Sequence, residues 1–466
     1  MILGDITNLP AELQTIIQED FLKRQFILGL EANLAFAAIA QVMNFPTGIG
    51  ESLTSTRAGL YALTDLDPIP PSQLTSDLNN GLTAEKWNVE QFTMRMGLYA
   101  KRAESTDSQT NNATIGSIFM HNTYALGELA GRLLDTLARN ALFSAYLSGN
   151  SFVLDTLGAP ALTLHVDNIV GFDKVYLSTI TTQGTDMYVP VSVTNPLNVT
   201  VSAIANPAGN VYICTGAVAD VTNISSVKAL GGISGTLTFT TNVTVLDGTA
   251  GSGLVSEFAP VVYRAGDQVS SYNLTASDIL TLSDLRSAVV ILRDNSVPLI
   301  NGMYNIYLTE TSMAQLYKDE EFKTLYASNP TISEYKNFRI VETSGLRFIV
   351  NQMSPFILNN NIIVQRPIVC GGGALVRGQN EAFLSGDRII GAPNSSVVIK
   401  DFATSRNNIK FILTVRPPMD LLGKIYDQAF QWIGGHVVPT DITATSEIIP
   451  TATDSYFKRA VVIETA

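Results

Sequence analysis

The sequence predicts an α+β protein that is interrupted by a segment made almost entirely of β-strands. Residues 114–147 carry apolar side chains at helical spacing over the longest such stretch in the chain. Residues 155–275 are dominated by Thr, Val, Ser, Asn and Gly, in short alternating runs between turn residues. Helical and strand patterns then follow one another to the C-terminus. The chain has 466 residues, which at roughly 150 residues per unit is enough for several folding units.

The composition of the chain argues against tight DNA binding and suits a protein that assembles with other copies. The chain has 29 basic and 41 acidic residues, a net charge of −12, so it lacks the concentrated Lys and Arg that tight DNA binding requires. Charged residues make up only 15% of the chain, a composition suited to a protein whose surface is largely covered by other copies. The most apolar stretch, residues 25–43, contains Glu31 and Asn33 near its middle. A membrane span is therefore not expected. The N-terminal stretch "MILGDITNLPAEL" has no basic residues ahead of an apolar run, so a secretory signal is not expected either.

The N-terminal region predicts a helix followed by strands. Residues 11–43 carry apolar side chains at helical spacing, and the Pro and Gly residues of "NFPTGIG" at 44–50 end this run. A strand candidate at 57–66 precedes a turn-rich span at 67–83, which predicts a long exposed loop.

A half-buried strand is predicted at 85–102, where apolar and polar residues alternate. Its apolar side is formed by Phe92, Met94, Met96 and Leu98. The strand ends at Lys101 and Arg102. These two form either an exposed basic pair or a contact with the acids of a neighbouring molecule.

The helix at 114–147 would span roughly 50 Å at about 1.5 Å per residue, long enough to run across a whole domain. One apolar stripe is predicted along it, formed by Ile115, Phe119, Leu126, Leu129, Leu133, Leu137 and Ala141. After the β-rich segment, the patterns predict helices at 277–296 and 312–327 with a strand at 302–309 between them, and closing strands at 409–417, 427–440 and 456–465.

Three consecutive acids, Asp319, Glu320 and Glu321, lie within the predicted helix at 312–327. Consecutive side chains on a helix point about 100° apart, so these carboxylates cannot converge on one ion without partners from elsewhere. The stretch predicts a solvated helical turn and not a metal or acid–base site.

The sequence contains no recognisable catalytic constellation. The three histidines, His121, His165 and His436, are far apart and have no metal-binding spacing. Cys214 and Cys370 form no CxxC motif and are expected to be reduced and buried. The glycine-rich stretch at 370–380 lacks the Lys and the hydroxyl of a phosphate-binding loop. We therefore expect no enzyme, and no catalytic residue, cofactor or metal.

Several stretches, in order along the chain, resemble the HK97-type fold of tailed-bacteriophage (Caudoviricetes) major capsid proteins, in particular those of the phage N4 type. "NFPTGIGESLTSTR" at 44–57 is similar to the turn from the N-terminal arm into the extended loop. "KWNVEQFTMRMGLYAKR" at 86–102 is similar to the return strand of that loop, and "ALGELAGRLLDTLARNAL" at 125–142 to the spine helix.

The second half of the chain carries the strongest resemblance, at 282–322. There a Leu- and Arg-containing helix, a Pro loop and a GxY strand precede a helix with the pattern Leu316, Tyr317, Asp319 and Phe322. "SGLRFIV" at 344–350 is similar to the next strand, "GALVRGQNEAF" at 373–383 to the following loop, and "QAFQWIGGHVV" at 428–438 to the last strand of the peripheral domain. The resemblance covers all of the chain except the β-rich segment.

The resemblance implies an HK97-like fold with an inserted all-β domain and a particular domain order. The implied units are an N-terminal arm at 1–56, an extended loop at 57–112, a spine helix at 113–154, the β insertion at 155–275, an axial domain at 276–410 and C-terminal strands of the peripheral domain at 411–466. It also implies that the extended loop lies over an adjacent subunit, with the Phe92 to Leu98 side buried there, and that the arm reaches another subunit. Asp319, Glu320 and Glu321 would then be structural or interfacial acids where subunits meet around capsomer axes.

The function implied is that of a structural protein, the major capsid protein of a tailed bacteriophage. Copies would assemble as hexamers and pentamers into an icosahedral head, in the virion after assembly in the host bacterial cytoplasm. The implied partners are other copies, the portal, decoration or scaffolding proteins, and loosely held double-stranded DNA, with no membrane. The alternatives are an encapsulin-like compartment, which has the same fold without DNA, and a β-rich adhesin or carbohydrate-binding protein.

Overall fold

A computed structural model of the chain describes residues 2–3, 21–31, 34–45, 52–61, 87–106, 118–176, 188–220, 232–257, 259–327, 342–359, 361–380, 397–403, 409–416, 421, 424–439 and 457–466. Helices and strands are both present in these ranges, which confirms the α+β class. No helix among the described residues is long and apolar enough to cross a membrane.

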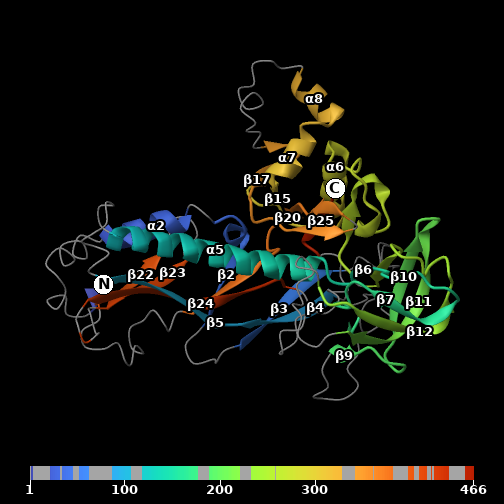
Figure 1. Cartoon of the computed structure of the whole chain (residues 1–466), viewed down its shortest axis with the longest axis horizontal. Coiled ribbons are helices and arrows are strands. Elements are labelled where there is room, and N and C mark those ends of the chain that lie inside the picture. The colour runs from blue at the N-terminus through green and yellow to red at the C-terminus, as the bar shows by residue number, and fades with distance from the viewer. Residues whose placement is uncertain are drawn as a thin grey trace, which may run out of the picture.

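The first of two main sheets has seven strands and lies along the longest helix, α5 (Ile118–Tyr146), as Figure 1 shows. Its strands, in spatial order, are β1 (Ile2–Leu3), β22 (Val397–Ala403), β23 (Lys410–Arg416), β24 (Ile425–Val437), β21 (Val376–Asn380) and β2 (Gln41–Phe45), and β5 (Gly97–Thr106) pairs with β24. Strand β21 occupies part of the predicted loop at 373–383. That expectation was wrong because β21 is held by its pairing with two distant strands, β2 and β24.

A shorter helix, α2 (Phe21–Glu31), packs on α5 with the two backbones unusually close (Figure 1). A Cβ atom on Gly29 would lie 2.4 Å from the carbonyl oxygen of Tyr124, and one on Gly127 would lie 2.2 Å from that of Phe26. Only glycine fits at either position, so the two glycines set how closely the helices approach.

The buried side of α5 is rotated relative to the predicted stripe. Its most deeply buried side chains recur every four residues at Leu126, Ala130, Leu134, Ala138 and Leu142. Leu129, a member of the predicted stripe, is exposed. Because α2 covers one side of α5 and the sheet another, the side chains that point between these two neighbours are the most buried.

The N-terminal helix is shorter than the predicted 11–43, of which 11–20 lie outside the described residues. Helix α2 ends at Glu31, a 3₁₀ turn η2 (Phe36–Ile39) follows, and the chain then forms β2. Phe26 and Phe36 are completely buried against other parts of the same chain. Residues 21–31 and 34–45 of the predicted arm therefore pack within their own subunit, which corrects the expectation that this part of the arm reaches a neighbour.

The second main sheet has six strands and carries three helices. Its strands, in spatial order, are β14 (Val262–Arg264), β25 (Ala460–Glu464), β20 (Ile368–Cys370), β15 (Tyr304–Leu308), β17 (Leu346–Val350) and β16 (Glu342–Thr343). The helices are α6 (Leu282–Asp294), α7 (Glu310–Leu316) and α8 (Glu320–Ala327). The helix predicted at 312–327 is thus two helices, broken at Tyr317 to Asp319.

The C-terminal strand β25 lies inside this second sheet, between β14 and β20, and not in the first sheet where it was expected. A buried ion-pair cluster fixes it there. Glu464 accepts hydrogen bonds at 3.0 Å from Nε of Arg366 and at 3.0 Å from Nε of Arg264. The side chains of Arg366 and Glu464 are almost completely buried, so neither charge is stable without the other.

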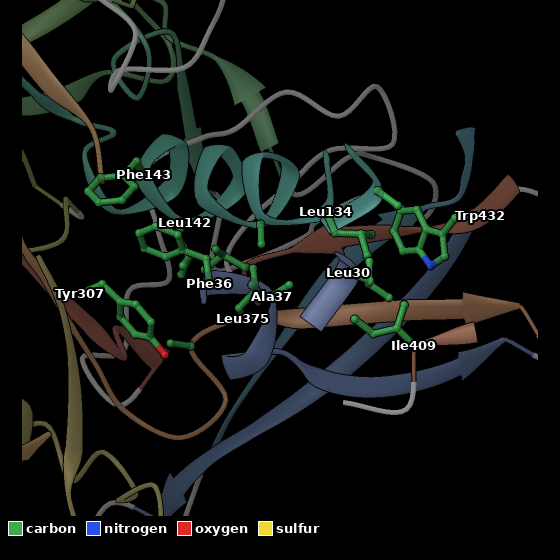
Figure 2. Packing of buried hydrophobic residues seen from close by; sticks show 14 of the residues in the cluster. Leu30, Phe36, Ala37, Leu134, Leu142, Phe143, Tyr307, Leu375, Ile409 and Trp432 are labelled. Atoms are coloured by element: carbon green, nitrogen blue, oxygen red, sulfur yellow. The ribbon is translucent and has the colours of Figure 1, made fainter. Parts of the chain in front are cut away.

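The two sheets share one hydrophobic core. Figure 2 shows Tyr307 of the second sheet near Phe36 and Phe143, and the rings of Tyr307 and Phe36 stack with centroids 4.9 Å apart. Leu134 and Leu142 of α5 lie in the same cluster. Each fully buried leucine contributes about 1.5–3 kcal/mol to folding, so this core holds the two sheets together as one body.

The β-rich segment forms a third sheet at one end of the molecule (right in Figure 1). Its six antiparallel strands, in spatial order, are β6 (Asn150–Phe152), β13 (Gly253–Ser256), β10 (Leu197–Ala203), β11 (Asn206–Ala219), β12 (Gly235–Val243) and β7 (Ala161–Val166), and a separate pair is formed by β8 (Lys174–Tyr176) and β9 (Tyr188–Pro190). These strands have their own hydrophobic core. The N–H of Ser256 donates to the carbonyl of Gly149 at 2.8 Å, so the chain leaves and re-enters the body of the protein at one place.

Two further strand pairs complete the fold. A ribbon is formed by β3 (Ser52–Tyr61) and β4 (Trp87–Arg95), and a short hairpin by β18 (Phe356–Asn359) and β19 (Ile362–Gln365).

Candidate assembly surfaces

The strand predicted at 85–102 is in fact two strands that belong to different sheets. β4 pairs with β3, whereas β5 pairs with β24, and the chain changes partner at Met96. Phe92 and Met94 of β4 are buried in a cluster with Val376 and Val437 of the same chain. These two residues are core residues of the subunit, which corrects their assignment to a contact with a neighbour.

Beyond Met96, which is partly buried, the alternation of inward and outward side chains is reversed. Tyr99 points inward and packs on Trp432, with ring centroids 5.5 Å apart, and Leu98 is 63% exposed. The prediction that Phe92, Met94, Met96 and Leu98 all lie on one buried side was wrong, because the backbone passes from one sheet to another between them. Gly97 was the available signal, since a glycine inside a strand pattern often marks a bend. Leu98 remains a candidate for a subunit contact.

Lys101 and Arg102 line an open groove of about 290 Å³ on the first sheet. The groove is also lined by the third cation Arg416 and by Asp427. One guanidinium nitrogen of Arg102, Nη1, lies 3.8 Å from the Asp427 carboxylate, and the other, Nη2, pairs with Glu104. Both cations are exposed, and Arg102 is paired with acids of its own chain. This placement is compatible with an exposed basic pair and with a contact to the acids of a neighbouring molecule.

The three consecutive acids have different roles. Asp319 accepts a hydrogen bond from the N–H of Leu282 at 3.0 Å and so connects the start of α8 to α6. Glu321 pairs with Arg286 of α6, and Glu320 is exposed. No group of three or more potential metal ligands occurs among the described residues. Asp319 and Glu321 therefore bind within the subunit, and Glu320 is free to face a neighbour.

An exposed apolar hairpin was missed by the sequence reasoning. On β18 and β19, Phe356, Leu358 and Ile363 are 62%, 64% and 52% exposed. Leu358 and Ile363 are paired across the hairpin. The available signal was a stretch without a single charge, from 348 to 365, that contains the turn sequence "NNN". Exposed apolar surface of this kind is typical of protein–protein contacts.

A buried carboxylate, Asp135 of α5, joins three distant parts of the chain. It accepts hydrogen bonds from the N–H groups of Ala35 and Ala37, at 2.9 and 3.0 Å, and from the side-chain amide of Asn351 at 3.0 Å. Burial raises the pKa of Asp135, and the backbone N–H groups act in the opposite direction. This junction fixes the turn between α2 and β2 and the end of β17 against the long helix.

The histidines and cysteines lie in environments that suit structural roles. Two carboxylates flank His165, Asp155 at 2.5 Å and Asp220 at 2.9 Å, and their hydrogen bonds raise the pKa of His165. His436 is buried against Trp432, and burial lowers the pKa of His436 to about 3. His121 lies exposed on α5. Both thiols, Cys214 and Cys370, are buried and free, and burial raises their pKa values, so neither forms a reactive thiolate near neutral pH.

No protein-family model matches this chain, and no curated protein matches it by sequence. Among solved structures, the chain is similar to the capsid of Ralstonia phage GP4, with a TM-score of 0.46 and 9% identity over 94% of this chain and 90% of that chain. It is also similar to the capsid of cyanophage P-SCSP1u, with a TM-score of 0.45 and 9% identity over 93% and 88%. For the capsid of cyanophage Pam1 the TM-score is 0.44, at 9% identity over 94% and 92%.

Proposed function

We propose that this chain is the major capsid protein of a tailed bacteriophage. Many copies, arranged as hexamers and pentamers, form the icosahedral head that encloses the viral DNA. The observation that supports this most is the order and packing of the elements. A strand ribbon precedes a 29-residue helix that lies along the first sheet, a second sheet with its own helices follows, and β22 to β24 return to the first sheet. This is the order that the sequence resemblance implies for an HK97-type subunit.

The domain assignments follow the same scheme. The ribbon β3–β4 belongs to the extended loop (57–112), with the first residues of β3 in the arm, and α5 belongs to the spine helix (113–154). The third sheet belongs to the β insertion (155–275), with β6 added from the end of the spine-helix unit. The second sheet belongs to the axial domain (276–410), to which β14 is added from the range assigned to the β insertion and β25 from the C-terminal unit (411–466). Strands β21 and β22 also lie within 276–410 but belong to the first sheet. The N-terminal arm (1–56) contributes α2 and β2 to the body of its own subunit.

Contacts between copies are assigned to the exposed features of the body. These are Leu98, the groove of Lys101 and Arg102, Glu320 and the hairpin β18–β19. Interfaces of about 1,600 Å² each are sufficient, because a closed lattice engages several at once. The net charge of −12 suits an inner wall that does not grip DNA phosphates. The proposed partners besides other copies are a portal and decoration or scaffolding proteins, with assembly in the host cytoplasm.

The test is to express the full chain, separate it by size exclusion and examine the large fractions by negative-stain electron microscopy. We expect closed particles of uniform diameter. A protein that remains monomeric at high concentration, alone and with lysate of phage-infected cells, would contradict the function. The nucleic-acid content of particles from infected cells distinguishes a phage head from an encapsulin-like compartment, which would contain no DNA.

A further inference from the structure

The sheet of the β insertion has an outer face without charged side chains at its centre. Its inner face is buried and includes Tyr212, Cys214 and Leu237. Because side chains alternate along a strand, the intervening residues point outward. On the middle strands β10, β11 and β12, those outward residues are Asn198, Thr200, Val211, Ile213, Val218, Thr236 and Thr238.

Exposed apolar side chains of this face lie along its central strand β11. Val211, Ile213 and Val218 of β11 are 66%, 42% and 66% exposed. A solvated face of an antiparallel sheet is ordinarily polar, so a row of exposed β-branched residues on a central strand is unusual. A bulge between Cys214 and Gly216 shifts the register of β11 against β12. That shift keeps Val218 on the outer side, where strict alternation would have turned it inward.

The charges near this face lie at its edges. Asn198 donates to the side chain of Glu257 at 3.0 Å beside β10. At the opposite edge, on β7, His165 lies between Asp155 and Asp220. A partner that covers the centre of the face therefore buries no charge. Burying an unpaired charge would cost several kcal/mol of binding free energy, and this contact avoids that cost.

We infer that this face binds the same face of a second copy of the chain, across a two-fold axis. The inference rests on the proposed function, in which copies meet in a shell. Two chains of net charge −12 repel each other, so they must meet through uncharged or complementary surfaces, and this face is uncharged. In a two-fold contact the same patch faces itself, which a neutral surface permits and a charged one opposes.

The size of the face agrees with a contact that needs a lattice. The side chains of β6 and β13 are buried, apart from the half-buried Val255, so the exposed face is formed by the other four strands. Four strands spaced about 4.8 Å apart, with about six residues each at roughly 3.3 Å per residue, give a face of about 400 Å². Two such faces bury about 800 Å², which is below the size of a standard specific interface. The contact is therefore weak between free subunits and becomes stable when other contacts hold the copies together.

Cysteine cross-linking tests this directly, because a residue near a two-fold axis lies close to itself in the second copy. Val211→Cys and Ile213→Cys place a thiol at the centre of the face, and both natural cysteines are buried. The matched control is Val193→Cys. Val193 is 81% exposed and lies in a connection of the same insertion, outside this face. Mild oxidation is applied to assembled particles and to concentrated full-length subunits.

We expect disulfide-linked dimers from Val211→Cys or Ile213→Cys and none from Val193→Cys. The absence of dimers from both variants in both preparations would overturn the inference, as would equal cross-linking of the control. If the unaltered chain forms no particles, the proposed function fails, and cross-linking of the concentrated subunits still decides the two-fold contact.

A charge exchange separates a second copy from a different partner protein. Val211→Glu and Val211→Lys should each reduce particle yield at least several-fold, because like charges meet across the axis. A one-to-one mixture of the two variants should recover most of the yield. Normal yields from both single variants, or no recovery on mixing, would contradict the two-fold contact.

Discussion

Replacing Asp135, a buried residue in the middle of α5, by alanine should strongly destabilise the subunit. The Asp135 carboxylate is the acceptor for the N–H groups of Ala35 and Ala37 and for the amide of Asn351. Each buried donor left without an acceptor costs about 1–3 kcal/mol. Three such donors cost about 3–9 kcal/mol, and removing a carboxylate whose pKa is raised by burial returns part of this.

The expected net loss for Asp135→Ala is about 3 kcal/mol in the free energy of unfolding, a large fraction of the stability of a typical domain. Equilibrium denaturation of the unassembled subunit measures it. Hydrogen exchange should also become faster at 34–45, because the turn before β2 loses its anchor. Asp135→Asn keeps one acceptor oxygen and should lose less than the alanine variant.

Glu128→Ala is the matched control on the same helix. Glu128 pairs with Arg132 on the exposed side of α5, so its replacement should change the free energy of unfolding by less than about 0.5 kcal/mol. If Asp135→Ala is as stable as this control, with unchanged exchange at 34–45, the carboxylate does not hold the turn and the reasoning is refuted.

Three further predictions follow from burial and topology. Leu98→Asp should leave the subunit as stable as the unaltered chain but lower particle yield, because Leu98 is exposed. Phe92→Asp should prevent folding at a cost of several kcal/mol, because Phe92 is a core residue. Thermal melts and electron microscopy measure both, and the reverse result would restore the assignment of Phe92 to a contact with a neighbour. Replacing 151–255 by a short Gly/Ser linker should leave the two-sheet body folded, because the flanking backbones already meet; wholly insoluble protein would count against these boundaries. His436 has a pKa lowered to about 3 from 6.5, so on acidification the unfolded chain takes up a proton that the folded chain does not, and stability is lost as the pH falls from about 6.5 towards 3. His436→Phe, which keeps a ring beside Trp432, should remove part of this acid sensitivity; an identical pH dependence of unfolding would exclude His436 as its source.

Elements with a strong local pattern could be predicted from the sequence. The apolar spacing along α5 is sustained for 29 residues, and the strands of the insertion alternate between turn residues, so both depend on neighbours in the sequence. Which side of α5 is most buried depends on α2, whose contact through Gly29 and Gly127 has no local signal.

Sheet membership could not be predicted, because it is decided by distant residues. β25 lies between β14 and β20 because Glu464 meets Arg264 and Arg366, residues about 200 and 98 positions away. The reversal at Met96 likewise follows from pairing with β24, far along the chain. For the candidate contact residues the consequence was direct. Phe92 packs into the core with Val376 and Val437, and the reversal after it leaves Leu98 outside.

Electron microscopy of the purified full-length chain tests the central claim most directly. If copies of this chain are made to enclose a volume, particles in the large fractions will be closed, of one diameter, and built from rings of five and six subunits. A homogeneous monomer at the highest attainable concentration, which also fails to enter particles when phage-infected cells supply the other components, would contradict it.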